Sequence, residues 1–433
     1  SLNVTNHCGY KYWEIGNENY GSWENDTNVP AHDPFTYANL TKSYIAAMKA
    51  ADPTIKIGIV VTTGEDSYAN NTAHPVVNPR TGQTHNGWTP VLLGTLKAIG
   101  VTPDFAAYHF YPQYTPSNWQ PNSPESDALL LQVGAQWASD AADLRQQLSD
   151  YLGDSATNVE IVCTENNCNS GSMGRQSTSI VNALYLADSI SQLMNTEINA
   201  CVWWDLHNGS DTTGDFDPTL YGWRNNGDYG VASTSNVRYP SFYAQKLLQY
   251  FVAPGDTVIA AASDSLLLSA YATRKSNGAL ALLVINKTPT NILNAEIELT
   301  NFIPWTNTLT RSFGIQQDEA TRTNGPAAAK DIATNSIVSA GLFTNSFPPY
   351  SLTLLTFPPT APTLSLPASA PSAGQLVFQI NGQPDTRFVI QNSADLQTWT
   401  RISTNTISSG SLLVTNNIVG TATPQFWRVM WEP

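Results

Sequence analysis

Two apolar runs of strand character each end abruptly in a polar cluster that contains a carboxylate. The first run occupies residues 10–16 and leads into Glu18, and the second occupies residues 159–163 and leads into Glu165. Apolar, β-branched and aromatic residues favour strands, and Gly21 after the first cluster marks a turn. These runs restrict the chain to folds that present carboxylates where strands end.

Amphipathic helical patterns alternate with strand-like runs through roughly the first 250 residues. Asp33-Pro34 is a helix start signal, because Asp caps the first turn and Pro fits the first helical position. Residues 54–63 form a continuous β-branched run, which is typical of a buried parallel strand. Helices are predicted at 34–51, 89–99, 126–152, 176–195 and 240–251, and further strands at 105–111 and 200–206. This alternation predicts βαβ units and a parallel sheet.

Carboxylates at the ends of two parallel strands can meet at one edge of the sheet. In a (β/α)8 barrel the catalytic residues come from the carboxyl ends of the strands. Hydrolysis of a glycosidic bond needs such a pair: one carboxyl group is protonated to help the leaving oxygen depart, and the other is ionised to attack the anomeric carbon or to activate water. Glu18 taken alone is better explained as a cap of the next segment. Glu165 at a second strand end favours the catalytic interpretation.

Two short sequences carry a resemblance to a known group of enzymes. Trp13-Glu14-Ile15-Gly16-Asn17-Glu18 and Thr164-Glu165-Asn166-Asn167 resemble the strand-four and strand-seven signatures of clan A glycoside hydrolases. These are retaining enzymes on a (β/α)8 TIM barrel, and they include α-L-arabinofuranosidases, xylanases and endoglucanases. The resemblance implies that Glu18 is the acid/base, that Asn17 contacts the sugar, and that Glu165 is the nucleophile. It implies no cofactor and no metal, since two carboxylates suffice.

Further sugar contacts are expected at other strand ends and in one loop. The resemblance favours His109 and Tyr111, although a strand-terminal His is more often a hydrogen-bonded structural residue. Trp119, in the loop that follows, is a candidate stacking platform. Of Trp203 and Trp204, the resemblance favours Trp204 as the aromatic residue under the sugar at the cleavage point.

The number of predicted barrel strands is five rather than eight. They begin near residues 10, 54, 105, 159 and 200. By the resemblance they are strands four to eight of the barrel. A five-stranded arc exposes two parallel edges, which is unfavourable. The first three units are therefore expected from an N-terminal segment outside this sequence or from a second chain that completes the barrel.

The strand pattern divides the chain into successive regions. Residues 1–252 are interpreted as the C-terminal five units of a catalytic (β/α)8 barrel. Residues 253–358 carry short strands and turns and resemble the β-sandwich that follows the barrel in arabinofuranosidase-like families. Residues 359–363 are a proline-rich linker, and residues 364–433 are a small β accessory module. The module is interpreted as carbohydrate-binding or as a passive or export-related spacer.

The composition bears on partners and location. The net charge is −14, the isoelectric point is about 4.7, and only 12% of residues are charged. An acidic chain disfavours nucleic acid and anionic membranes as partners, because both select basic patches. No apolar run approaches the length of a membrane span. A surface rich in Asn, Thr, Ser and Gln is typical of extracellular enzymes, so we expect a secreted, bacterial-type protein.

The most specific interpretation is a retaining glycoside hydrolase that cleaves plant cell-wall polysaccharide or oligosaccharide. The chain has 12 Trp and 18 Tyr, and aromatic residues in the predicted mouth loops favour several sugar subsites. Several subsites favour an endo-β-1,4-glucanase or xylanase. An α-L-arabinofuranosidase fits the first signature and the sandwich nearly as well. A non-enzymatic alternative is a carbohydrate-binding remnant of a barrel.

Overall fold

The computed structural model describes residues 9–70, 73–116, 125–318, 330–366, 375–417 and 424–432. The chain divides into two compact units. The first consists of Ser1–Ser177, Ser189–Leu220 and Asn225–Gly230, and the second of Thr178–Asp188, Tyr221–Arg224 and Val231–Pro433. In the described ranges, no helix is both long and apolar enough to cross a membrane.

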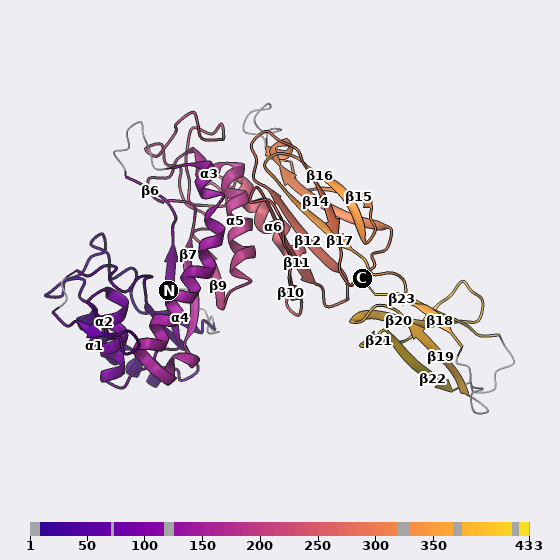
Figure 1. The fold of residues 1–433 in the computed structure, drawn as a ribbon, viewed down its shortest axis with the longest axis horizontal. Coiled ribbons are helices and arrows are strands. Elements are labelled where there is room, and N and C mark those ends of the chain that lie inside the picture. Colours follow the sequence, from indigo (N-terminus) through magenta and orange to yellow (C-terminus); the bar gives the residue numbers. More distant parts are fainter. Residues whose placement is uncertain are drawn as a thin grey trace, which may run out of the picture. The chain divides into compact units, whose positions relative to one another are not determined.

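A five-stranded parallel sheet is the framework of the first unit (Figure 1). Its strands follow one another in chain order across the sheet, and every neighbouring pair is parallel. The strands are β1 (Tyr12–Glu14), β2 (Lys56–Val60), β5 (Phe105–Phe110), β7 (Glu160–Asn166) and β9 (Ile198–Trp203). Their carboxyl ends therefore meet at one edge of the sheet, as the βαβ pattern predicts.

Helices between these strands pack on the sheet through apolar side chains. Ile57 of β2 belongs to one buried core with Trp88 and Leu144, which come from two of the connecting helices. Burying a side chain of this size contributes about 1.5–3 kcal/mol. The connecting helices are α1 (Pro34–Ala51), α2 (Trp88–Ala98), α4 (Gln136–Leu152) and α5 (Ile180–Leu193), the last with residues in both units.

The helix predicted over residues 126–152 is interrupted. It consists of α3 (Asp127–Leu130), the 3-10 turn η1 (Val133–Ala135) and α4. Gly134 lies in the break, and glycine is a poor helix former. The other short elements of this unit are β3 (Val76–Val77), β4 (Thr84–His85), β6 (Tyr114–Thr115), η2 (Gly153–Asn158), β8 (Ser170–Gly171) and η3 (Arg175–Thr178), the last of which ends one residue into the second unit.

Among the described residues the parallel sheet is a half-barrel. β1 and β9 each pair with a single neighbouring strand. Tyr12 and Trp13 of β1 are 51% and 45% exposed, and Val202 of β9 is 50% exposed. Further strands that paired with these edges would cover the exposed apolar side chains. Closure into a full (β/α)8 barrel stays a prediction.

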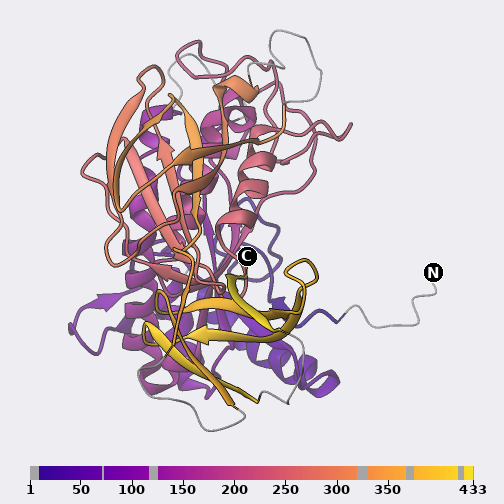
Figure 2. The same cartoon turned by 90° about the vertical axis from the view of Figure 1, so that its right-hand side faces the viewer.

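Antiparallel sheets make up most of the second unit (Figures 1 and 2). One has six strands in the order β10-β11-β12-β17-β14-β15, and β13 pairs with β16. Leu282, Ile297 and Phe347 bring both sheets into one apolar core. Short antiparallel strands are thus present where predicted, and the sandwich arrangement is still a prediction. The elements are α6 (Pro240–Phe251), β10 (Thr257–Ile259), β11 (Leu268–Arg274), β12 (Leu280–Asn286), β13 (Leu293–Glu298), β14 (Asn307–Gly314), β15 (Ala333–Val338), β16 (Leu342–Phe347) and β17 (Ser351–Phe357).

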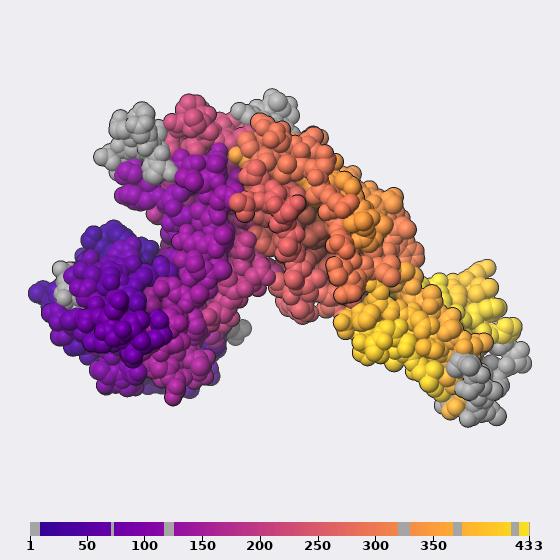
Figure 3. Space-filling view, in the orientation of Figure 1, coloured from indigo at the N-terminus to yellow at the C-terminus, as the bar shows by residue number. Residues whose placement is uncertain are grey.

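The C-terminal strands form two three-stranded antiparallel sheets, β18-β19-β22 and β21-β20-β23. Figure 3 shows their atoms, coloured gold to yellow, gathered in one lobe. Phe378, Phe388 and Ile407 are buried in its core. The predicted linker is hydrogen-bonded to another segment of the second unit: the Thr360 N–H donates to the Ile303 carbonyl at 3.1 Å. The strands are β18 (Thr363–Ser365), β19 (Gln375–Asn381), β20 (Thr386–Ser393), β21 (Thr400–Ile407), β22 (Ser411–Asn417) and β23 (Phe426–Trp431).

Candidate active site

Glu18 is positioned by a tight turn after β1. The strand ends at Glu14, and the chain then turns through Gly16 and Glu18, whose φ angles are +79° and +40°. The positive φ of Gly16 favours glycine, and a Cβ there would also lie 2.0 Å from Oδ1 of Asn19 and displace that side chain. The Gly21 N–H donates to the Glu18 carbonyl at 2.7 Å and closes the turn. Glu18 therefore lies in a turn rather than on the strand, in a conformation uncommon outside glycine, as is often found at functional sites.

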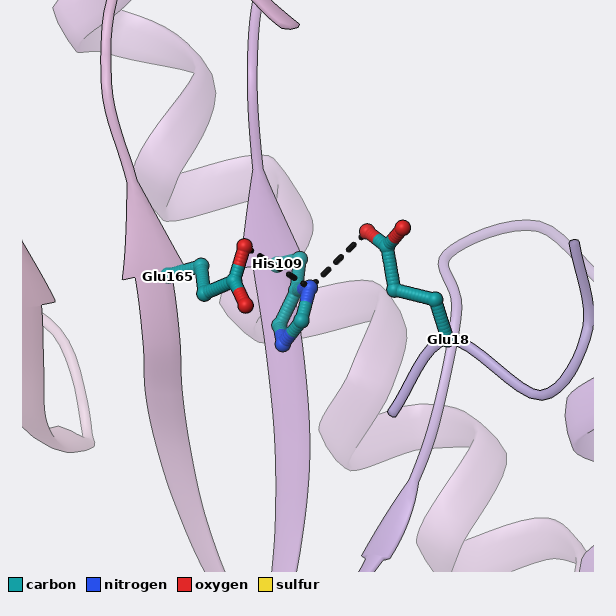
Figure 4. Close-up of side chains that lie close together, drawn as sticks. All are labelled: Glu18, His109 and Glu165. Atoms are coloured by element: carbon teal, nitrogen blue, oxygen red, sulfur yellow. Dashed lines mark hydrogen bonds and ion pairs between the residues drawn. The ribbon is translucent and has the colours of Figure 1, made fainter. Parts of the chain in front are cut away.

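His109 and Glu165 come from adjacent strands and point toward Glu18 (Figure 4). His109 of β5 stands opposite Glu165 of β7, just after a register shift between the two strands. His109 Nδ1 lies 2.8 Å from Glu18 Oε1 and 3.6 Å from Glu165 Oε2. One oxygen of Glu18 and one of Glu165 lie within 4.8 Å of each other. The fold thus brings both carboxylates to a single imidazole.

Three donors converge on Glu18. Besides His109, the Tyr20 hydroxyl donates to Oε1 at 3.1 Å and the Trp23 indole N–H donates to Oε2 at 2.6 Å. Burial acts to raise the pKa of Glu18, but the hydrogen bonds from His109 and Trp23 outweigh it and hold this pKa below its ordinary value. Glu18 is ionised in the free protein.

Glu165 has fewer donors. The Tyr111 hydroxyl donates to its Oε2 at 2.7 Å. Burial raises the pKa of Glu165 above its ordinary value, and His109 and the Tyr111 hydrogen bond offset this only in part. The two carboxyl groups are therefore shifted in opposite directions.

The neighbouring carboxylates favour the protonated form of His109. Burial acts to lower its pKa, but Glu18, Glu165 and Glu14 together raise it above its ordinary value. Glu14 contributes at longer range, with its Oε1 at 3.9 Å from His109 Nε2, and burial raises its own pKa. The Glu18, His109 and Glu165 donor atoms are close enough to hold a metal ion, the only such cluster in the described part of the chain.

A cavity of about 1010 Å³ opens onto these groups. Its wall is polar at the centre and aromatic around it, which suits a ligand with both hydroxyl groups and apolar C–H faces. The residues that line it are Asn17, Glu18, Tyr20, Trp23, Tyr68, His109, Tyr111, Tyr114, Glu165, Ser170, Gly171, Trp204 and Tyr229.

Six of the seven residues singled out by the sequence line this one cavity: Asn17, Glu18, His109, Tyr111, Glu165 and Trp204. Trp204 directly follows β9 and is 43% exposed, and Trp203 does not line the cavity. The Asn17 side chain donates to Glu24 at 2.9 Å. Trp119 lies outside the described residues. The roles assigned to these residues stay predictions.

Several lining residues were not predicted. Tyr20 and Trp23 lie immediately after the Asn17-Glu18 pair, and their closeness to it was the signal that could have found them. Tyr68 and Tyr229 belong to loops far away in the sequence and carry no local signal of a role. Their position is visible only once the loops have packed.

Solved structures share this fold. They include an α-L-arabinofuranosidase from Thermotoga maritima in complex with arabinose (TM-score 0.53, 18% identity), the bifunctional glucanase-xylanase CelM2 from a metagenome library (0.54, 18%) and a Paenibacillus polymyxa xyloglucanase of glycoside hydrolase family 44 (0.54, 16%). These alignments cover 80–81% of this chain and 65–66% of the known structures, so the chain spans about two thirds of their length.

Comparison by sequence gives no match. No family model matches the chain, and no curated protein does. The similarity to known proteins therefore rests on the structure alone. Over the aligned part, the chain shares the fold of these glycoside hydrolases, and the resemblance indicated by its two signatures is confirmed at the level of the fold.

Proposed function

We propose that the protein is a retaining glycoside hydrolase that cleaves plant cell-wall polysaccharide outside the cell. The observation on which the proposal rests is the pair of partly buried carboxylates, Glu18 and Glu165, with oxygens within 4.8 Å of each other in an aromatic-lined cavity. A separation of about 5 Å between carboxyl groups is typical of retaining enzymes, because it leaves no room for a water between the second carboxylate and the sugar.

The roles proposed here are those that the resemblance to clan A glycoside hydrolases implies. Glu165 attacks the anomeric carbon while Glu18 protonates the leaving oxygen, and Glu18 then takes a proton from the water that releases the glycosyl-enzyme. The Tyr111 hydroxyl stabilises the ionised form of Glu165 and fixes its orientation. Asn17 and Trp204 would contact the sugar at the cleavage point.

The first step needs a proton on Glu18, which is ionised in the free protein. His109 can supply it, because its Nδ1 lies 2.8 Å from Glu18 Oε1 and its raised pKa keeps the imidazole protonated to higher pH than an ordinary histidine. Transfer along this hydrogen bond converts an imidazolium–carboxylate pair into an imidazole and a carboxylic acid. His109 then acts as the proton donor to the acid/base residue Glu18.

The substrate is proposed to be a β-1,4-glucan or xylan cleaved internally. The aromatic side chains on several sides of the cavity support an extended substrate. One of the similar structures is a glucanase-xylanase and another is a xyloglucanase. An α-L-arabinofuranosidase is the second candidate, favoured by the similarity to the Thermotoga maritima enzyme with arabinose.

The test is hydrolysis by the wild type and three variants. Aryl β-cellobioside, β-xylobioside and α-L-arabinofuranoside, together with dyed glucan and xylan, would identify the substrate. Glu165→Ala should lose activity by about four orders of magnitude or more. Glu18→Ala should lose activity on polymers but retain formation of the glycosyl-enzyme from aryl substrates with good leaving groups.

Azide and a matched variant complete this test. Azide should rescue Glu18→Ala with retained anomeric configuration and Glu165→Ala with inverted configuration. Glu160→Gln, at the opposite end of β7, is the control and should remain active. Near-normal activity of Glu165→Ala on polymer would contradict the assignment. Oligosaccharide binding with no turnover by the wild type would instead favour the carbohydrate-binding remnant.

A further inference from the structure

Three aromatic residues of the cavity donate hydrogen bonds to the carboxylates, two of them to Glu18 and one to Glu165. Tyr20 and Trp23 donate hydrogen bonds to Glu18, whereas Tyr111 donates to Glu165. The backbone of Trp204 lies next to the Glu165 strand, because its main-chain N–H donates at 3.0 Å to the carbonyl of the residue that follows Glu165. The cavity thus has two chemically distinct sides.

The hydrogen bonds also orient Glu18. Its Oε1 faces His109, which in turn lies near Glu165. Its Oε2 accepts from Trp23. Trp23 therefore lies on the side of Glu18 that is remote from Glu165. Under the proposed function Glu18 protonates the leaving oxygen, so this remote side is where the departing part of the substrate lies.

The Trp23 side chain is largely exposed on this leaving-group side of Glu18. It is 60% exposed, although its indole N–H is hydrogen-bonded. Gly21 lies under the ring, and a Cβ at that position would come within 2.2 Å of it. Tyr20 and Tyr68 meet the Trp23 ring at 80° and 73°, and no aromatic ring of the described residues stacks on it. An indole face is thus free to stack on the C–H face of a sugar.

Tyr68 extends this surface from a second loop. Its ring lies 4.5 Å from that of buried Tyr20 and is itself 40% exposed. The φ angle of Tyr68 is +51°, a strained value for a bulky residue. The Asn70 side chain donates to the Tyr20 carbonyl at 2.7 Å and ties the two loops together. The packing of the two loops thus holds Tyr68 in its strained conformation beside Trp23.

We propose that Trp23, backed by Tyr20 and flanked by Tyr68, is the binding surface for the sugar on the leaving-group side of the scissile bond. This inference rests on the proposed function, because Glu18 as proton donor defines the leaving-group side. It makes Trp23 a specificity-determining residue. The protein is then adapted to substrates whose leaving group is itself a sugar, such as the interior of a glycan chain, rather than to small non-sugar leaving groups.

The experiment compares two substrates that share the sugar on the attacked side. One is the aryl glycoside that the wild type hydrolyses, and the other is the matching oligosaccharide, cellotetraose or xylotetraose. Trp23→Ala should lower kcat/KM for the oligosaccharide about tenfold more than for the aryl glycoside, the scale of one aromatic contact. The lost hydrogen bond to Glu18 affects both substrates, whereas the lost stacking face affects only the oligosaccharide. Trp23→Phe keeps a stacking face and should lie between Trp23→Ala and the wild type.

A control separates this effect from the loss of any exposed Trp. Trp305 is 47% exposed and belongs to the second unit, so Trp305→Ala should leave both substrates unchanged. Equal losses on both substrates in Trp23→Ala, or no loss on either, would overturn the proposal. Equal oligosaccharide losses in Trp305→Ala and Trp23→Ala would do the same.

Binding distinguishes this proposal from the proposed function. If the wild type hydrolyses nothing, the proposed function fails, and calorimetric titration with cellotetraose and xylotetraose still tests the surface. Binding that weakens about tenfold in Trp23→Ala supports it. Binding that is unchanged in Trp23→Ala, or absent from the wild type, overturns it.

Discussion

At the residue scale, the difference between the two carboxylates comes from the donors around them. Glu18 accepts from three side chains and Glu165 from Tyr111 at hydrogen-bond distance, with His109 at 3.6 Å. Each donor stabilises the ionised carboxylate, so removing one raises the pKa of its partner. Two tyrosines, one on each carboxylate, provide a matched pair of tests.

Tyr111→Phe should shift the acidic limb of the kcat/KM profile to higher pH. The hydroxyl lowers the pKa of Glu165, and Glu165 must be ionised to attack, so without it ionisation requires a higher pH. We expect a loss of about tenfold near neutral pH, the scale of one hydrogen bond to a charged group. The measurement is kcat/KM against pH with one aryl substrate. An acidic limb that stays in place would contradict the contact.

Tyr20→Phe should have the opposite effect on kcat/KM near neutral pH. The Tyr20 hydroxyl is one of the groups that lower the pKa of Glu18, and Glu18 acts as an acid while protonated. Its removal should therefore increase the protonated fraction of Glu18 and keep kcat/KM at or above that of the wild type. If Tyr20→Phe loses activity as Tyr111→Phe does, the assignment of the two roles is wrong.

At the element scale, the start of α1 is fixed by one carboxylate. Asp33 accepts from the Thr36 N–H at 2.9 Å and from the Thr36 hydroxyl at 2.6 Å. Asp33→Ala should lower the free energy of unfolding by about 1 kcal/mol, because the first turn loses its cap. Urea denaturation measures the loss. Asp33→Asn keeps an acceptor and should cost less, and an equal loss in both variants would show that charge rather than capping matters.

The open edge of β1 is a second feature of this scale. Tyr12 and Trp13 are exposed next to a strand with one neighbour. We predict that residues 1–433 expressed alone self-associate and that added polypeptide carrying three further βα units suppresses this. Size-exclusion chromatography with light scattering, circular dichroism and hydrolysis would show it. A monodisperse, cooperatively melting and active monomer would contradict the predicted barrel register.

At the scale of the whole molecule, the C-terminal strands carry no part of the candidate site. Their contacts within the second unit include Trp431, whose indole N–H donates to the Asn277 carbonyl at 2.9 Å. Deleting residues 362–433 should leave hydrolysis of small soluble substrates within about twofold of the full chain, since no lining residue is removed. Activity assays and thermal melts of both forms test this. Loss of the first unit's folding on truncation would refute the independent-module interpretation.

The sequence by itself determined the features that depend on local pattern. β-branched runs between amphipathic helices produce a parallel sheet, because each pattern matches one periodicity of the backbone. Asp33-Pro34 marks the start of α1 for the same local reason. Glu18 and Glu165 were found because polar clusters that end apolar runs come together wherever parallel strands share one edge.

Only the tertiary structure decided how these residues are coupled. His109 lies between the carboxylates because β5 and β7 pair in the register that sets it opposite Glu165. Trp23 and Tyr68 meet beside Glu18 because two loops, 45 residues apart, pack on Tyr20. Such contacts depend on register and loop packing, which are set by the sum of many distant interactions rather than by any local pattern.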